Sequence, residues 1–148
     1  MADAAVLSFG AATAIFDVAG RVLLVRHTYG QRNWELPGGL GEPGEDPGST
    51  ARRELREETG LELDVRTLSG LYFEAEHRLG PFLHMVFRAD CTDGQPDPVP
   101  SSDEVDAAAF FPLDALPRPM SDFTERRIRD ACGTEPVFDV IGPRRWLA

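Results

Sequence analysis

Three glutamates in one short run are the residues of this chain best placed to do chemistry. Glu54, Glu57 and Glu58 stand in the segment 53–58, whose sequence is RELREE. On a helix that advances about 100° per residue, their side chains fall within an arc of roughly 100°. Carboxylates on one helical face repel one another unless they are solvated or share a cation, and such oxygen donors suit Mg²⁺ or Mn²⁺. The run by itself fits either a metal site or a solvated acidic surface.

The flanking residues predict the helix that must hold these glutamates. Asp46 is a favourable N-cap, Pro47 suits the first helical position, and Gly60 suits the C-terminal cap. We therefore expect a helix from about Pro47 to Thr59. Leu55 points to a different sector from the glutamates and can pack against a sheet.

Strand patterns lie on both sides of the predicted helix. Before it, the apolar runs Ala11 to Phe16 and Arg21 to His27 predict a β-hairpin, and a short extended piece follows at Trp34 to Leu36. After it, alternating apolar and charged residues from Leu61 to Val65 predict a half-buried strand. Further strands are expected over Gly70 to Glu76, Phe82 to Cys91 and Ala107 to Phe111, although the alanines of the last segment also permit a helix.

The C-terminal part of the chain predicts a second helix and a tail. Pro112 to Leu116 is expected to be a short turn of helix, Ser121 can cap a helix to about Ala131, and residues 134–148 should be extended or irregular. Strands with two substantial helices indicate an α/β fold in which helices sandwich a mixed sheet. The length of 148 residues predicts one domain, 1–148, with its core at about 11–131.

Composition narrows the class of protein. The net charge is −10 and all 15 basic residues are arginine. Such a chain is not expected to be a stable partner of nucleic acid, which needs a basic stripe. No apolar run approaches the ~20 residues of a membrane helix. The N-terminus does not resemble a secretory signal, so we expect a cytoplasmic protein without membrane association. The sequence permits a homodimer but does not require one.

The glutamates belong to a longer pattern with fixed spacing. It consists of Gly39, five residues, Glu45, seven residues, and then RELREETGL from Arg53 to Leu61. This matches every defined position of the Nudix box, so the chain resembles the Nudix hydrolases, in particular those of the MutT type. Residues 34–39, just before the box, also resemble the family, as do residues 103–105 and 111–113 downstream of it. The resemblance covers most of residues 11–131 and implies the Nudix α/β/α sandwich.

The resemblance implies a metal centre on the predicted helix. Glu57 and Glu58 match the principal metal-ligand positions of the family. Glu54 matches a position that binds metal directly or through water and acts as general base in some members. The carbonyl of Gly38 resembles a backbone ligand seen in family members. The implied cofactor is Mg²⁺ or Mn²⁺.

Three further charged residues have implied supporting roles. Arg53 and Glu45 match positions usually occupied by supporting charges, and an Arg53–carboxylate contact would hold the glutamates in place. Glu104 is a candidate for an additional ligand or general base, because its loop should approach the helix. The alternative for Glu104 is an exposed loop acid in a very acidic segment.

The implied reaction is divalent-metal-dependent hydrolysis of a diphosphate linkage in a nucleoside diphosphate derivative. The metal would lower the pKa of a bound water that attacks phosphorus, and a carboxylate would accept the proton. We expect a small-molecule nucleotide as substrate, a nucleoside triphosphate as for MutT-type pyrophosphohydrolases. ADP-ribose or another nucleoside diphosphate sugar is the alternative. A nucleotide-sensing module without hydrolysis is an alternative of another class.

Aromatic and basic residues outside the box are candidates for recognising the rest of the substrate. The candidates are Phe9, Tyr29, Trp34, Tyr72, Phe73 and Phe82 for stacking, and Arg26, Arg32 and Arg78 for phosphate or ribose. For each, core packing or a solvated surface is the simpler interpretation. His27, His77 and His84 are expected to be ordinary strand or surface histidines.

Overall fold

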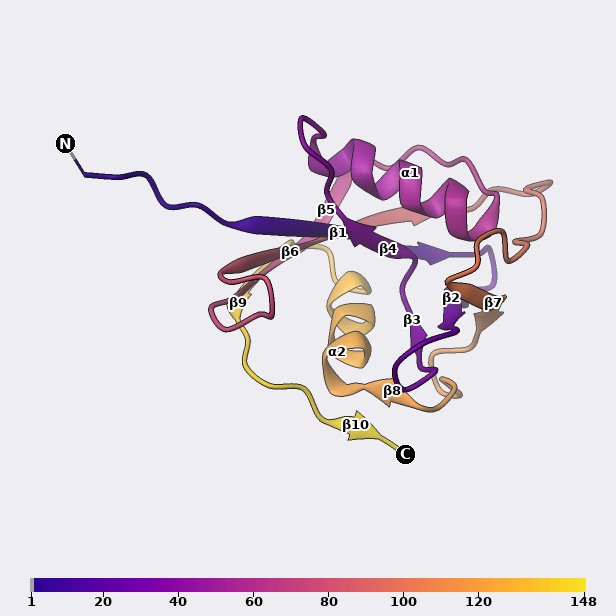
Figure 1. The fold of residues 1–148 in the computed structure, drawn as a ribbon. Coiled ribbons are helices and arrows are strands. Elements are labelled where there is room, and N and C mark those ends of the chain that lie inside the picture. The colour runs from indigo at the N-terminus through magenta and orange to yellow at the C-terminus, as the bar shows by residue number, and fades with distance from the viewer. Residues whose placement is uncertain (1) are drawn as a thin grey trace.

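A mixed sheet lies between two helices in the computed structural model, which describes residues 2–148 (Figure 1). The elements in chain order are β1 (Ser8–Phe16), β2 (Val22–His27), β3 (Trp34–Glu35), β4 (Gly38–Leu40), α1 (Pro47–Thr59), β5 (Thr67–Glu74), β6 (Phe82–Asp90), β7 (Val105–Phe111), β8 (Met120–Ser121), α2 (Asp122–Ala131), β9 (Val137–Val140) and β10 (Trp146–Leu147). All but β8 and β10 belong to one eight-stranded sheet, and those two strands pair with each other. The predicted α/β sandwich is confirmed. No helix of the described residues is long and apolar enough to cross a membrane.

Strand β1 is the centre of the sheet. It pairs in parallel with β6 from Ser8↔Phe82 to Phe16↔Asp90, and antiparallel with β4. Its predicted hairpin partner β2 meets it only at Phe16↔Val22 and then turns away to pair with β3 and β7. The predicted hairpin is therefore present at its turn alone, and the divergence of β2 leaves the side of β1 open to β4.

The two faces of the sheet carry separate apolar clusters. Along β1 the side chains alternate: Ile15 packs toward α1 together with Leu55, while Ala14 packs toward α2 together with Ile128. This period of two is what a strand buried on both faces must show. Each helix therefore covers one face of the sheet, as Figure 1 shows.

The predicted caps of both helices are confirmed. The Asp46 carboxylate accepts the Ser49 N–H at 2.9 Å at the start of α1, and Gly60 ends that helix with φ 74°. Ser121 caps α2 by accepting the Thr124 N–H at 3.0 Å. The helix that carries the glutamates therefore begins and ends where the sequence predicted.

The predicted strand from Leu61 to Val65 is wrong. The burial does alternate as expected, with Leu61 and Val65 buried, but this segment pairs with no strand of the described chain. The Val65 carbonyl instead accepts an Arg52 N–H at 3.2 Å. The segment crosses from α1 to β5 and buries its apolar residues beside the helix, so side-chain packing alone produced the strand-like pattern.

Two further predictions change at the C-terminal end. Pro112 to Leu116 is a turn, closed by the Ala115 N–H to the Pro112 carbonyl at 3.1 Å, and is not helical. The tail is extended as expected, and it also adds β9 in parallel to β5 and β10 antiparallel to β8. The tail is therefore part of the fold.

Candidate metal centre and adjoining pocket

Arg53 connects the box loop to the glutamates of α1. Its guanidinium donates to both oxygens of Glu45 at 2.8 and 3.1 Å, to Glu54 Oε1 at 2.9 Å and to Glu57 Oε2 at 3.3 Å. It also donates to the Leu40 carbonyl at 3.0 Å. Hydrogen bonds from Arg53 hold the pKa of Glu45 at about 2. The contact between Arg53 and the carboxylates, expected from the sequence, is present.

Two glycines let strand β4 lie close to its neighbours, Gly39 to helix α1 and Gly38 to strand β1. A Cβ on Gly39 would lie 2.5 Å from Glu54 Oε1, and a Cβ on Gly38 would lie 2.5 Å from the Ala11 carbonyl oxygen. Neither position has room for a side chain. The Gly38 N–H donates to Glu58 Oε1 at 3.2 Å, so the backbone of β4 lies directly against the carboxylates.

Glu58 is the buried member of the acidic group. Its side chain is 3% exposed, and its Oε2 atom has no hydrogen-bond partner within residues 2–148. Burial, and then the neighbouring Glu54 carboxyl, raise the pKa of Glu58 to about 9. A carboxylate left in this state is costly without a positive charge. The carboxyl groups of Glu54 and Glu58 therefore lie together beside the backbone of β4, and oxygen donors of this kind fit a divalent cation.

The loop that carries Glu104 is tied to the end of α1. The Val99 N–H donates to the Thr59 carbonyl at 2.9 Å, and the Ser101 N–H donates to the Glu58 carbonyl at 3.1 Å. After burial and the Glu54 carboxyl, the Glu104 charge also contributes to the raised pKa of Glu58. The loop does approach the helix, as expected, and Glu104 itself is exposed.

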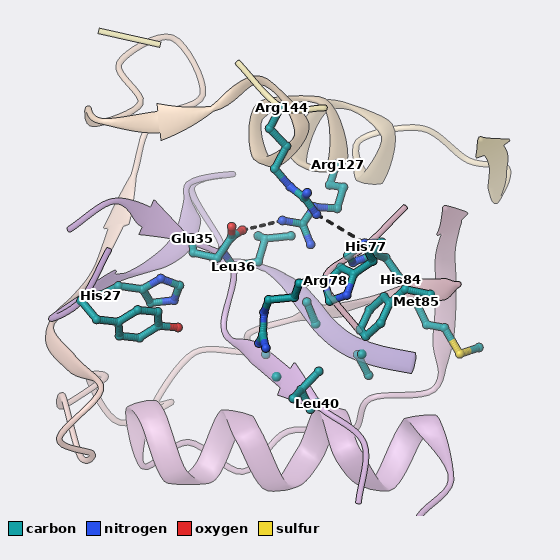
Figure 2. Close-up of a pocket in the computed structure, with 17 residues that line it drawn as sticks. His27, Glu35, Leu36, Leu40, His77, Arg78, His84, Met85, Arg127 and Arg144 are labelled. Carbon is teal, nitrogen blue, oxygen red and sulfur yellow. Dashed lines mark hydrogen bonds and ion pairs between the residues drawn. The ribbon is translucent and has the colours of Figure 1, made fainter. Parts of the chain in front are cut away.

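A pocket of about 320 Å³ lies on the other side of β4 from α1 (Figure 2). Its floor comes from β1 and from Gly38 to Leu40 of β4. One wall is the stacked pair His27 and Tyr29, with ring centroids 4.7 Å apart. On the other side, His77 stacks on Phe82 at 4.0 Å. The pocket therefore has flat rings on two sides, and it shares β4 with the acidic group.

Two partly buried ion pairs lie at the α2 end of the pocket. Arg127 donates to Glu35 Oε1 at 2.6 Å, and Arg144 donates to the two oxygens of Glu74 at 3.0 and 3.1 Å. His84 lies 2.8 Å from Glu74 Oε1, and burial lowers the pKa of His84 to about 4. The imidazole is thus uncharged at neutral pH, and each arginine has one carboxylate.

Glu74, His77 and His84 could also be considered as metal ligands. Their ligand atoms lie within 4.8 Å of one another. The Arg144 guanidinium, however, already occupies both oxygens of Glu74 and lies 3.4 Å from His84 Nε2. Glu74 is therefore already paired with a cation, whereas Glu58 has no ion pair in the described part of the chain.

Some of the residues predicted to recognise the substrate line the pocket, and others lie in the core or in surface ion pairs. Tyr29, Phe82 and Arg78 line the pocket. Tyr72 is buried in the core and donates to Asp130, and Arg26 and Arg32 pair with Asp106. The sequence did not single out Glu35, Glu74, Arg127 or Arg144. Their only signal was the position of Glu35 in the segment before the box, because the others are brought together over separations such as the 92 residues between Glu35 and Arg127.

Comparisons with known proteins agree with this geometry. The model of the NUDIX domain matches residues 7–132. The chain belongs to the NUDIX family. A solved structure of this family, the MutT NUDIX hydrolase of Burkholderia pseudomallei, superimposes with a TM-score of 0.72 at 26% identity and covers 85% of this chain and 98% of its own.

Two curated relatives show different extents of similarity to this NUDIX chain. The ADP-ribose pyrophosphatase of Methanocaldococcus jannaschii is 31% identical over 123 residues, which are 81% of this chain and 70% of the relative. Nucleoside diphosphate-linked moiety X motif 6 of Mus musculus is 48% identical over 71 residues, which are 47% of this chain. That alignment spans only 22% of the mouse protein.

Proposed function

We propose that this NUDIX chain hydrolyses the diphosphate linkage of a small nucleotide with the help of a divalent metal ion, Mg²⁺ or Mn²⁺. The observation that carries the proposal is Glu58, a buried carboxylate with one oxygen unpartnered among the described residues, lying beside Glu54. Without a cation, burial favours the protonated form of Glu58, and a bound cation would allow this carboxyl to ionise as a ligand. The Glu57 carboxylate and the Gly38 carbonyl complete the donors that would hold it.

When bound, the metal supplies charge neutralisation at the diphosphate oxygens and activates water for attack on phosphorus. Arg53 keeps Glu54 and Glu57 in position through hydrogen bonds of 2.9 and 3.3 Å. Glu54, whose side chain is 12% exposed, is our candidate for the base that takes the proton from the attacking water. Glu104 would assist as an additional negative charge at the rim.

The pocket beside β4 supports a nucleotide substrate. Its ring-lined walls suit a planar base, and its floor leads along Gly38 and Gly39 to the carboxylates. Burial raises the pKa of Tyr29, and the charges of Glu104 and Glu58 raise it further, which places this wall close to the acidic group. A diphosphate at the metal centre and a base in the pocket can therefore belong to one molecule.

A nucleoside triphosphate is the substrate that we propose first, as a MutT-type member would use. A second candidate is ADP-ribose or another nucleoside diphosphate sugar. The specific observation in its favour is the archaeal relative named ADP-ribose pyrophosphatase, which aligns over 81% of this chain. The same pocket would hold the base of either substrate.

The deciding experiment incubates the protein with nucleoside triphosphates, diphosphate sugars and dinucleotides, with Mg²⁺, with Mn²⁺ or with chelator. Products are identified by mass spectrometry in ¹⁸O-labelled water, so that the label marks the phosphorus that was attacked. We expect metal-dependent cleavage of at least one nucleotide. Tight calorimetric binding of a nucleotide without turnover under every metal would instead establish a sensing module.

A further inference from the structure

The last residues of the chain contribute to the pocket although they lie outside the family match. The NUDIX match ends at residue 132, and Arg144 lines the pocket. The segment is anchored on both sides of Arg144. Upstream, the Ile141 N–H donates to the Phe73 carbonyl at 2.8 Å; downstream, the Arg145 carbonyl accepts the Asp122 N–H at 2.8 Å. The tail therefore holds one guanidinium in a fixed place at the pocket.

The side chain of Arg144 is itself tightly oriented. It donates to both oxygens of Glu74, and its guanidinium carbon lies 5.1 Å from the centre of the Phe123 ring. Because a guanidinium is planar and carries more N–H groups than the two Glu74 bonds use, donors remain for another acceptor. Its side chain is 30% exposed, so a molecule in the pocket can reach it.

The charge balance at this end of the pocket favours an uncharged group over a phosphate. Arg144 is neutralised by Glu74, and Arg127 is neutralised by Glu35, so a phosphate placed here would also meet two carboxylates. Arg78 is different. It has no ion pair among the described residues, and in Figure 2 it lies between the two ring-lined sides, above Leu40 of β4.

We propose that Arg144 is a specificity residue that donates hydrogen bonds to uncharged acceptor atoms of a nucleobase held between the ring-lined walls. The phosphates would then extend past Arg78 toward Gly38 and Gly39, where the acidic group lies. The tail beyond the NUDIX domain would thereby select which nucleotide is bound. This inference rests on the proposed function, because it assigns the base end of the same substrate.

Binding without metal tests the base contact separately from hydrolysis. The probes are AMP, GMP, CMP, UMP and ribose 5-phosphate, which differ in the base but share the phosphate, measured by calorimetry. The wild-type protein should bind at least one nucleotide more tightly than ribose 5-phosphate. Arg144→Ala should weaken that nucleotide about ten- to one-hundred-fold and leave ribose 5-phosphate unchanged.

Matched variants separate recognition from folding. Arg145→Ala removes the adjacent arginine, whose side chain is 84% exposed and pairs with Asp122 at the surface, and it should bind like the wild type. Arg144→Lys retains a charge beside Glu74 but not the planar pair of donors, so it should recover only part of the loss. Thermal melting of each variant shows whether the fold is kept. If Arg144→Ala has a much lower Tm than the wild type, the binding of Arg144→Lys decides the role of Arg144 instead.

Turnover with Mg²⁺ provides the second arm of the experiment. Arg144→Ala should raise KM for the preferred nucleoside triphosphate with kcat little changed, and should flatten the ranking of the four bases. Equal weakening of ribose 5-phosphate, or an unchanged ranking of bases in an active enzyme, would overturn the role of Arg144 alone. If the wild-type protein cleaves no nucleotide but binds one more tightly than ribose 5-phosphate, the proposed hydrolysis fails, and the binding measurements with Arg144→Ala still decide the role of Arg144.

Discussion

The two sides of strand β4 handle charge in opposite ways. On the side of α1, Glu45, Glu54 and Glu57 share the guanidinium of Arg53, and the buried Glu58 forms no ion pair with any residue from 2 to 148. On the pocket side, each of two arginines meets one carboxylate within hydrogen-bond distance. The first region therefore has more carboxyl groups than guanidinium groups, which is the basis of the proposed cation site. The α2 end of the pocket is balanced, so it can distinguish ligands by hydrogen bonding and shape.

The contrast also explains how the two regions could divide one reaction. Electrostatic stabilisation is largest where charge develops and water is excluded, which places the chemistry at the carboxylates. The charge-balanced end of the pocket gains little from binding a highly charged group, but it rejects a base whose donors and acceptors leave its own buried groups unpaired. Rate should therefore depend on α1, and selectivity on the pocket.

Removing a carboxylate from α1 should have the largest effect. Glu57→Gln and Glu58→Gln each take one charged oxygen donor from the proposed metal centre while keeping the shape of the side chain. Because a metal ion contributes several kcal/mol of charge stabilisation, we expect kcat to fall about a thousandfold or more. The measurement is metal-dependent release of phosphate or pyrophosphate from the nucleotide found in the panel.

Glu62→Gln is the matched control for these variants, because Glu62 is exposed just beyond the end of α1. It should retain wild-type turnover. Full activity in Glu57→Gln would remove Glu57 from the metal centre, even if other family features were retained.

Metal binding should stabilise the protein through the α1 side only. At a free Mg²⁺ or Mn²⁺ concentration about a hundredfold above Kd, mass action gives about 2.7 kcal/mol, or a rise in Tm of roughly 5–10 °C for a chain of this size. Glu58→Gln should lose most of this rise, whereas Arg144→Ala should keep it. An equal loss in both variants would mean that both regions contribute to cation binding, which would contradict a metal site confined to the α1 side.

The sequence predicted the α1 side far better than the pocket side, for a physical reason. The carboxylates, Arg53 and the two glycines lie within residues 38–58, so helix periodicity and fixed spacing place them together. The caps of α1 are likewise local. The pocket depends on β4 entering beside β1 and on a tail that returns along β5, and neither pairing has a signature in the spacing of residues. The wrongly predicted strand at 61–65 illustrates a related limit. Alternation of apolar and charged residues indicates which side chains are buried, and such burial can occur in a segment that pairs with no strand.

Acid should weaken the pocket side through His84. Burial lowers its pKa to about 4, so the folded protein resists a proton that the unfolded chain accepts near its ordinary pKa of about 6.5. Stability is therefore full above about pH 6.5 and is lost as the pH falls toward 4. Between pH 7.5 and 5 this costs about 2 kcal/mol.

Denaturant melts at a series of pH values test this contribution. His84→Gln should lose about 2 kcal/mol less than the wild-type protein over that interval. His77→Gln is the comparison variant, because His77 lines the same pocket and burial lowers its pKa as well, but it is less buried than His84. If both variants follow the wild-type curve, the protonation of His84 is not what limits the pocket in acid.

The smallest effect is expected at the rim, where Glu104 approaches the carboxylates of α1 from an exposed loop. Glu104→Gln should lower kcat about tenfold, because it removes one negative charge near the attacking water but leaves Glu54 to take the proton. Asp103→Asn is the control, since Asp103 is exposed on the same loop and its contact with Thr28 uses the backbone carbonyl. A fall of more than about a hundredfold, with loss of the acidic limb of the kcat profile, would make Glu104 the base. The loop that carries Glu104 would then belong to the catalytic region together with α1.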